Sequence, residues 1–304
     1  MKEKTTISGH ITALITILIW GMTFISTKIL LVDFTPIEIL FFRFVIGFLA
    51  LLIVYPHRLK LTDKKQEWIF AFAGLTGVTL YYLLQNFALI HSLASNIGVV
   101  VSVAPFFTAI LAHFFADKEA LKPNFFIGFI AAIAGIILMS FSGGSGFEFH
   151  PLGDILAVLA AAVWAVYSLL AKKISTFGYN SIATTRHTFF YGLLFMIPVF
   201  FLTDSKLDLE RFAESANLLN MLFLGLAASA ICFVTWNYAV KLLGPVKTSV
   251  YIYIVPVVTV ISSVLVLHEK ITLVSALGII LALIGLFVSE SKSFHINKRE
   301  KQKQ

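Results

Sequence analysis

Charge and cysteine are both scarce in this chain. Only 13% of its 304 residues are charged, against about a quarter in soluble proteins. Apolar residues make up 59%, which is more apolar surface than one soluble core of this length can hide. The single cysteine, Cys232, excludes an internal disulfide and any metal site that needs several thiolates. These scarcities exclude a soluble globular protein and predict an integral membrane protein.

Motifs for catalysis and for phosphate binding are also missing. The chain contains no His-Glu-x-x-His, and its Ser-Gly-Gly-Ser-Gly turn at 142–146 lacks the Gly-Lys-Ser/Thr of a phosphate loop. We therefore expect no catalytic residues, no metal and no cofactor. The net charge of +7 does not indicate nucleic acid binding, because the basic residues lie at the ends of apolar stretches.

The chain does contain ten apolar stretches long enough to span a bilayer, which takes about 20 residues each. They must be helices, because backbone amides in lipid need partners within their own segment. No ten-residue alternating segments are present, so a membrane β-barrel is excluded. The predicted fold is an all-α integral membrane protein with ten transmembrane helices. The spans are 5–27, 36–55, two spans within 68–116 joined by a hairpin near His91–Asn96, 124–141, 152–171, 181–203, 216–240, 246–267 and 272–289.

Lysine and arginine placement predicts the orientation of these spans. With a cytoplasmic N-terminus, 17 of the 23 basic residues fall in inside loops or termini and four fall outside, while Arg43 and Arg186 lie within spans. This bias follows the positive-inside rule. The expected location is the inner cell membrane, multi-pass, with both termini cytoplasmic and residues 291–304 forming a basic cytoplasmic tail.

The second half of the chain repeats the first. Seven residues recur in the same order, 143–151 residues further along. We predict two five-helix repeats, 8–141 and 152–290. Because five is odd, the second repeat enters the membrane upside down, which is typical of secondary transporters. The recurring pairs are Trp20 and Trp164, Arg43 and Arg186, Asn86 and Asn237, Pro105 and Pro256, Glu119 and Glu269, Gly128 and Gly278, and Gly135 and Gly285.

Several motifs resemble those of the EamA-type branch of the drug/metabolite transporter superfamily. They are Trp20-Gly21-x-x-Phe24, Phe42-Arg43-Phe44, and a proline followed by a glutamate near a helix end, at Pro105 and again at Pro256. The first half departs from the pattern, with Asp117-Lys118-Glu119 in place of Gly-Glu. The resemblance implies a ten-helix transporter, often an exporter of amino acids or other small metabolites. It also implies a substrate held between the halves by helices 1, 3, 4, 6, 8 and 9.

Polar and aromatic side chains at mid-depth are the candidate substrate contacts, since such groups prefer a cavity or a helix contact to lipid. Arg186, flanked by threonines and His187, favours a wet surface, whereas Arg43 is embedded in phenylalanines and favours packing. The alternative for either arginine is snorkelling or a tie to loop carbonyls of the other half. Pro105 and Pro256 are expected in mid-helix and are candidate hinges. The candidate substrate-binding residues are Trp20, Tyr82, Gln85, Asn86, Ser102, Trp164, Arg186, Asn237, Tyr251 and Tyr253.

The predicted function is export of a small metabolite, such as an amino acid, by alternating access. The expected partners are that small molecule and the lipid bilayer; the oligomeric state is not indicated. Alternatives are a drug efflux or uptake carrier of the same fold, a non-transporting membrane scaffold, or an intramembrane hydrolase. No acidic residue lies deep in a span, so we expect facilitated diffusion or exchange. Proton coupling through His113, His187 or a half-exposed Glu38 is the alternative.

Overall fold

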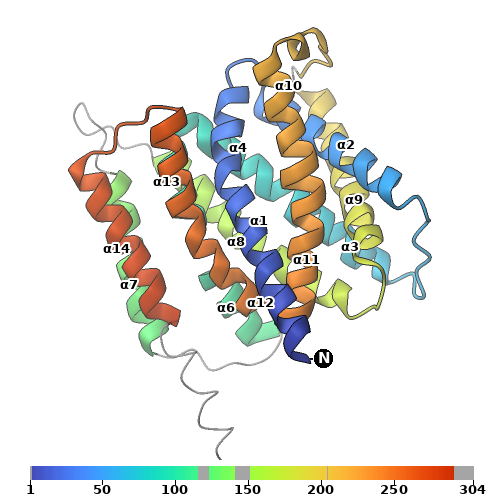
Figure 1. Cartoon of the computed structure of the whole chain (residues 1–304), viewed down its shortest axis with the longest axis horizontal. Helices are drawn as coiled ribbons and strands as arrows, with labels where there is room; N and C mark the ends of the chain where they lie inside the picture. The colour runs from blue at the N-terminus through green and yellow to red at the C-terminus, as the bar shows by residue number, and fades with distance from the viewer. Residues whose placement is uncertain (1, 116–122, 141–150, 204, 291–304) are drawn as a thin grey trace, which may run out of the picture.

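The computed structural model describes residues 2–115, 123–140, 151–203 and 205–290, and these residues form helices and connecting turns with no strand. The predicted all-α class is therefore confirmed for this part of the chain (Figure 1). The first half contains α1 (Lys2–Leu30), α2 (Pro36–Val54), α3 (Gln66–Gly74), the π-helix η1 (Leu75–Leu80), α4 (Tyr81–His91), α5 (Ala94–Val101), α6 (Ala104–Phe115) and α7 (Pro123–Ser140). The second half contains α8 (Pro151–Ser175), α9 (Ser181–Leu202), the short 3₁₀ turn η2 (Glu210–Ala213), α10 (Ser215–Leu222), the π-helix η3 (Phe223–Ile231), α11 (Cys232–Leu243), α12 (Pro245–Ser249), the 3₁₀ turn η4 (Val250–Ile254), α13 (Val255–Val266) and α14 (Leu273–Glu290).

Within the described residues, eight helices are long and apolar enough to cross a membrane. Four of the eight are single helices, and the other four join successive elements, for example α3, η1 and α4 over residues 66–91. Shorter apolar helices lie in α7 and α14. The count of ten spans stays a prediction. The turn at 142–146, Glu119 and the tail at 291–304 lie outside the described residues.

Two helices start at matching places in the halves, and each has a side-chain cap. Thr35 begins α2 with a capping box, in which its hydroxyl accepts from the Glu38 N–H and the Glu38 carboxylate accepts from the Thr35 N–H. Asn180 begins α9, and its Oδ1 accepts from the N–H groups of Ile182 and Ala183 at 2.8 and 3.3 Å. Capping satisfies amides that a helix start would otherwise leave unpaired.

Irregular helix also recurs at matching places. The π-helices η1 and η3 both precede the segment that carries the twin asparagines. Each proline follows a tightened turn. In the first half the Ser102 N–H donates to Val99 O, and in the second half the turn is the 3₁₀ turn η4. Pro105 and Pro256 were expected in mid-helix; instead each is the second residue of a new helix segment, where a missing N–H costs nothing. Their role as hinges stays a prediction.

The two halves are intertwined. Helix α1 packs against α11 and α13, and its counterpart α8 packs against α4, α5 and α6. Helix α2 packs against η3, and α9 packs against α3 and η1. At one edge of the molecule α7 and α14 lie side by side (Figure 1). A Cβ on Gly135 would lie 2.5 Å from Gly278 O, so these small residues let the two backbones touch.

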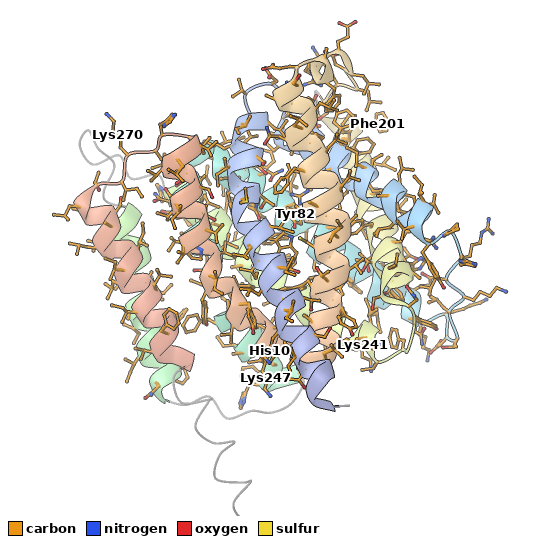
Figure 2. All side chains as sticks on the ribbon, viewed as in Figure 1. His10, Tyr82, Phe201, Lys241, Lys247 and Lys270 are labelled. Atoms are coloured by element: carbon orange, nitrogen blue, oxygen red, sulfur yellow. The ribbon has the colours of Figure 1, made fainter. Side chains whose placement is uncertain are left out.

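The two ends of the helix bundle can be distinguished by their basic residues. Figure 2 shows Lys241 and Lys247 with His10 at the end where the chain begins, Lys270 at the opposite end, and Tyr82 between them. Helix α1 runs from the first of these ends to the second, so Lys28 in its last turn lies at the Lys270 end. We call these the Lys241 end and the Lys270 end.

Candidate functional site

A central cavity lies where the two halves meet. Its walls come from α1, α4 and α8 and from the broken helices around Pro105 and Pro256. The position matches the expected substrate position between the halves, near Tyr82 in the middle of the bundle (Figure 2). The lining residues are Ile17, Trp20, Thr23, Phe24, Tyr81, Tyr82, Gln85, Val101, Ala104, Trp164, Ile252 and Val255.

Aromatic rings form much of this wall. The twin tryptophans meet edge to face, with the Trp20 and Trp164 ring centroids 5.2 Å apart. Tyr81 packs on Trp164 at 4.8 Å, and the Trp20 indole N–H donates to the Ala228 carbonyl in η3 at 2.9 Å. Rigid rings fixed in this way offer a solute a large apolar contact area at little entropic cost.

Two lining side chains carry hydrogen-bond donors without a protein partner. They are Nε2 of Gln85, whose side chain is 1% exposed, and Nε1 of Trp164, which is 3% exposed. A buried polar group without a partner costs about 1–3 kcal/mol. Such groups beside a cavity suit a solute that supplies the missing acceptors.

Arg43 lies fully buried behind this wall. Its guanidinium carbon is 4.2 Å from the centroid of the Tyr82 ring and 5.2 Å from that of Phe44. Its Nε donates to the Ser229 hydroxyl in η3 at 3.0 Å, while Nη1 and Nη2 have no hydrogen-bond partner. A cation that makes one neutral hydrogen bond and lies against the cavity wall can act electrostatically on the contents of the cavity.

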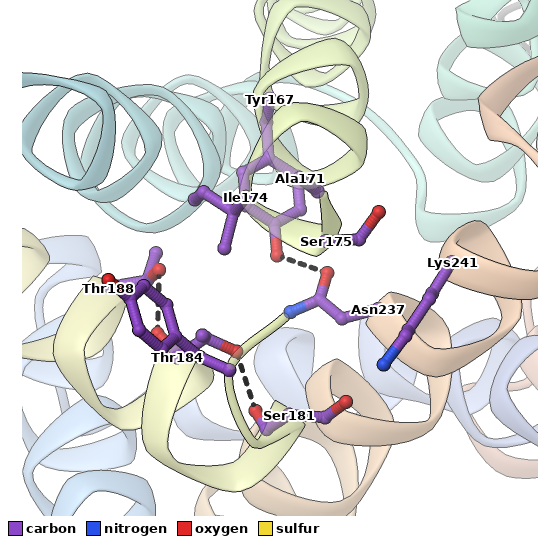
Figure 3. Close-up of a pocket in the computed structure, with 10 residues that line it drawn as sticks. Tyr167, Ala171, Ile174, Ser175, Ser181, Thr184, Thr188, Asn237 and Lys241 are labelled. Carbon is purple, nitrogen blue, oxygen red and sulfur yellow. Dashed lines mark hydrogen bonds between the residues drawn. The ribbon is translucent and has the colours of Figure 1, made fainter. Parts of the chain in front are cut away.

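A second cavity lies toward the Lys241 end, between the end of α8, the start of α9 and α11 (Figure 3). The Tyr167 hydroxyl donates to Asn237 Oδ1 at 2.8 Å, and Asn237 Nδ2 donates to the Thr185 hydroxyl at 3.1 Å. Figure 3 shows Asn237 between the Tyr167 hydroxyl and the Lys241 side chain. Tyr167 also packs on Trp164 at 4.9 Å, so one aromatic layer separates this cavity from the central one.

Arg186 lines neither cavity. Its Nη1 donates to the carbonyl of Tyr55, and its Nη2 donates to that of His57 at 2.6 Å, just beyond the end of α2. This geometry corresponds to the alternative of a structural tie to loop carbonyls in the other half. The two arginines are twins in the sequence but have different surroundings.

The structure brings four of the predicted contact residues together at the central cavity, namely Trp20, Tyr82, Gln85 and Trp164. Asn237 lines the second cavity instead. Their roles in binding a substrate stay predictions. Five predicted residues line neither cavity: Asn86, which donates to Pro36 O; Ser102, which donates to Val99 O; Tyr251, which bonds His10; Tyr253; and Arg186.

Sequence reasoning missed Tyr167 and the second cavity. The signal was present, because Tyr167 lies three residues after Trp164 and therefore on the same face of α8. Lys241 was interpreted only as an orientation signal, although its side chain also lines the second cavity. A lysine that helps to set the orientation of the helices can also line a cavity.

Comparison with known proteins gives the family. The EamA-like transporter family model matches the chain twice, at residues 7–141 and 151–290. The chain is similar to an uncharacterized transporter of Archaeoglobus fulgidus, with 28% identity over 96% of this chain and 99% of that protein. It is 26% identical to the uncharacterized transporter YdfC of Bacillus subtilis, over 97% of this chain and 95% of the relative.

Two further similarities are more distant. A probable terminal-alkyne amino-acid exporter of Streptantibioticus cattleyicolor is 25% identical over 81% of each chain. A solved structure titled "Crystal structure of protein" shares the fold with a TM-score of 0.66 and 18% identity, over 95% of this chain and 97% of that one. The family model matches nearly the whole length of this chain, so this multi-pass membrane chain belongs to the EamA-like transporter family.

Proposed function

We propose that this protein is a ten-helix secondary carrier of the cell membrane that exports a small metabolite by alternating access. Residues 8–141 and 152–290 form inverted repeats around the central cavity, and both termini are cytoplasmic. The family and the names of the relatives support transport, and the amino-acid exporter among them supports a solute of that size. The observation that carries alternating access is a difference between the two ends of the bundle.

The Lys270 end is held closed by two sets of hydrogen bonds. Lys28 Nζ donates to the carbonyls of Leu89 and Ser92 at the end of α4, at 2.5 and 3.0 Å. The Glu269 carboxylate accepts from the N–H groups of Ala94 and Ser95, at 2.9 and 3.2 Å, and from the Ser95 hydroxyl at 2.7 Å. Together these bonds tie α1 and the end of α13 to the hairpin between α4 and α5. Charge-assisted bonds of this kind are about twice as strong as neutral ones.

The counterparts of the Lys28 bonds are not formed at the Lys241 end, as far as the described residues extend. The repeat offsets make Lys172 the counterpart of Lys28, and Val240 and Leu243 the counterparts of Leu89 and Ser92. In the described part of the chain, the Lys172 ammonium bonds to neither carbonyl; Val240 O accepts from the Gly244 N–H instead. The second cavity lies at this end, beside the end of α8. We infer that this conformation is open toward the cytoplasm. In the outward-open state, the Lys172 bonds would form and the Lys28 bonds would break.

Cysteine accessibility tests this proposal. In a Cys232→Ser background, Ser175→Cys probes the second cavity and Thr23→Cys probes the central one. A membrane-impermeant thiol reagent should reach Ser175→Cys from the cytoplasmic face. Adding Lys28→Gln should lower that reactivity and raise the reactivity of Thr23→Cys from outside, because the population shifts to the outward-open state.

Lys270→Gln is the matched control, since it removes an exposed charge next to Glu269 without touching these bonds. It should leave both reactivities unchanged. If Lys28→Gln also leaves them unchanged, the bonds at the Lys270 end do not control access and the alternating mechanism is wrong. Labelling of Ser175→Cys from outside only would reverse the orientation.

A further inference from the structure

Arg43 brings a positive charge into the membrane without a counter-charge. Its side chain is fully buried, and no carboxylate pairs with it among the described residues. Its contacts are the neutral Ser229 hydroxyl and the rings of Tyr82 and Phe44. Removing a charge from water is costly unless an opposite charge or several hydrogen bonds replace the water. The protein alone does not supply that compensation.

Two buried donors beside the cavity in front of Arg43 have no partner. Gln85 Nε2 and Trp164 Nε1 line it, are buried and have no partner. Two unpartnered buried acceptors are Asn86 Oδ1 and the Thr27 hydroxyl oxygen, and neither residue lines the cavity. Thr23, which does line it, uses its hydroxyl to donate to Trp20 O. The lining atoms that are buried without a partner are therefore both donors, and a ligand with acceptor oxygens would satisfy them.

The route to the cavity has the same charge preference. No aspartate or glutamate lines either cavity, and Lys241 lines the second one. The remaining wall of the central cavity is aromatic and aliphatic. A low-dielectric cavity with cations nearby and no anions attracts a negative solute and repels a positive one.

We propose that the central cavity takes an organic anion, a carboxylate with an apolar body. Its charge is balanced by Arg43 across the Tyr82 ring, its oxygens accept from Gln85 and Trp164, and its body lies against Trp20 and Tyr81. This substrate class rests on the proposed function, because it concerns the same cavity. In this proposal Arg43, and not its twin Arg186, selects the charge of the substrate.

A matched series of probes tests the charge preference directly. Hydrocinnamate, its neutral primary amide and the corresponding cationic amine share one apolar body and differ in the end group. Two of the four tryptophans line the cavity, so binding to the purified full chain can be followed by intrinsic fluorescence. We expect hydrocinnamate to bind at least about tenfold more tightly than either analogue, a difference of about 1.4 kcal/mol.

Variants assign that preference to Arg43. Arg43→Gln should reduce the anion preference to less than about twofold, whereas Arg43→Lys, which keeps the charge, should retain most of it. If Arg43→Gln does not fold, Gln85→Leu provides the second test and should weaken hydrocinnamate more than the amine. Lys247→Gln, an exposed basic residue outside both cavities, is the control and should leave the preference intact.

Two outcomes overturn the proposal: no binding of hydrocinnamate, or equal or tighter binding of the amide or amine. An unchanged preference in folded Arg43→Gln removes Arg43 from the assignment and contradicts it in the same way. Flux in proteoliposomes tests the proposed anion class separately from the proposed carrier function. Saturable flux of the amine would contradict the anion class and leave the carrier standing. Anion-selective binding without flux of any probe would contradict the carrier.

Discussion

Replacing Arg186 by glutamine should destabilise the protein more than it impairs transport. The guanidinium makes two charge-assisted bonds to the carbonyls of Tyr55 and His57, and its side chain is 7% exposed. Each such bond contributes about 1.5–3 kcal/mol, and glutamine can replace at most one of them, so we expect a loss of roughly 3 kcal/mol. At about 2–4 °C per kcal/mol, the melting temperature in detergent should fall by roughly 6–12 °C.

Arg43→Gln is the matched comparison for that prediction. It gives up one bond to Ser229 and a ring contact of about 0.5–2 kcal/mol. The variant also relieves the cost of an unpaired buried charge, so its melting temperature should change little while anion flux is lost. Both variants should be measured for thermal unfolding and for flux per folded molecule. Normal stability with lost flux in Arg186→Gln would refute the assignment of the two arginines.

Three further outcomes follow from the contacts. Gly74→Ala should lower stability by roughly 1–3 kcal/mol in thermal unfolding, since its Cβ would lie 2.6 Å from the Gly192 backbone nitrogen, which cannot move aside; wild-type stability would show that α3 and α9 are not so closely packed. Lys28→Gln should lower both melting temperature and flux, whereas Lys172→Gln should lower flux alone, because only Lys28 is bonded in this conformation; equal loss of melting temperature would contradict the asymmetry. In a Cys232→Ser background, a cysteine at 207 should be labelled from outside and one at 62 only from the cytoplasm; the reverse pattern would invert the predicted topology.

Much of the fold could be predicted because the bilayer makes the sequence signal strong. Long uncharged stretches marked the helices, and the predicted hairpin near His91–Asn96 is where α4 ends and α5 begins. Recurrence also located the central cavity, since Trp20 and Trp164 were paired by sequence and meet in space. Duplicated residues near a repeat axis are brought together by the symmetry itself.

The roles of the twin arginines could not be predicted from their neighbours in the chain. Adjacent residues on a helix point about 100° apart, so the phenylalanines beside Arg43 say little about what its side chain meets. Its surroundings are Tyr82 in α4 and Ser229 in η3. The environment of Arg186 depends on how the chain after α2 folds back over α9. Such contacts between distant segments have no local sequence signal.

Glu38 shows the same limit. Its place at a helix start led to the expectation of a half-exposed carboxylate, but its side chain is 2% exposed. Arg211 Nη1 donates to it at 2.9 Å, and the Lys206 N–H donates to it at 2.6 Å, from a loop that follows α9. The expectation was wrong because that loop lies far away in sequence and folds over the start of α2. Paired in this way, Glu38 is a poor candidate for a proton carrier.

We propose above all that the purified chain carries small organic solutes across a bilayer through the cavity between its halves. The most direct measurement is efflux from proteoliposomes loaded with a whole-cell metabolite extract, with every solute followed by mass spectrometry. We expect selective loss of a few organic anions, strongly slowed by Gln85→Leu and by Lys172→Gln. Retention of every solute by vesicles that contain folded protein, at the level of protein-free vesicles, would contradict it.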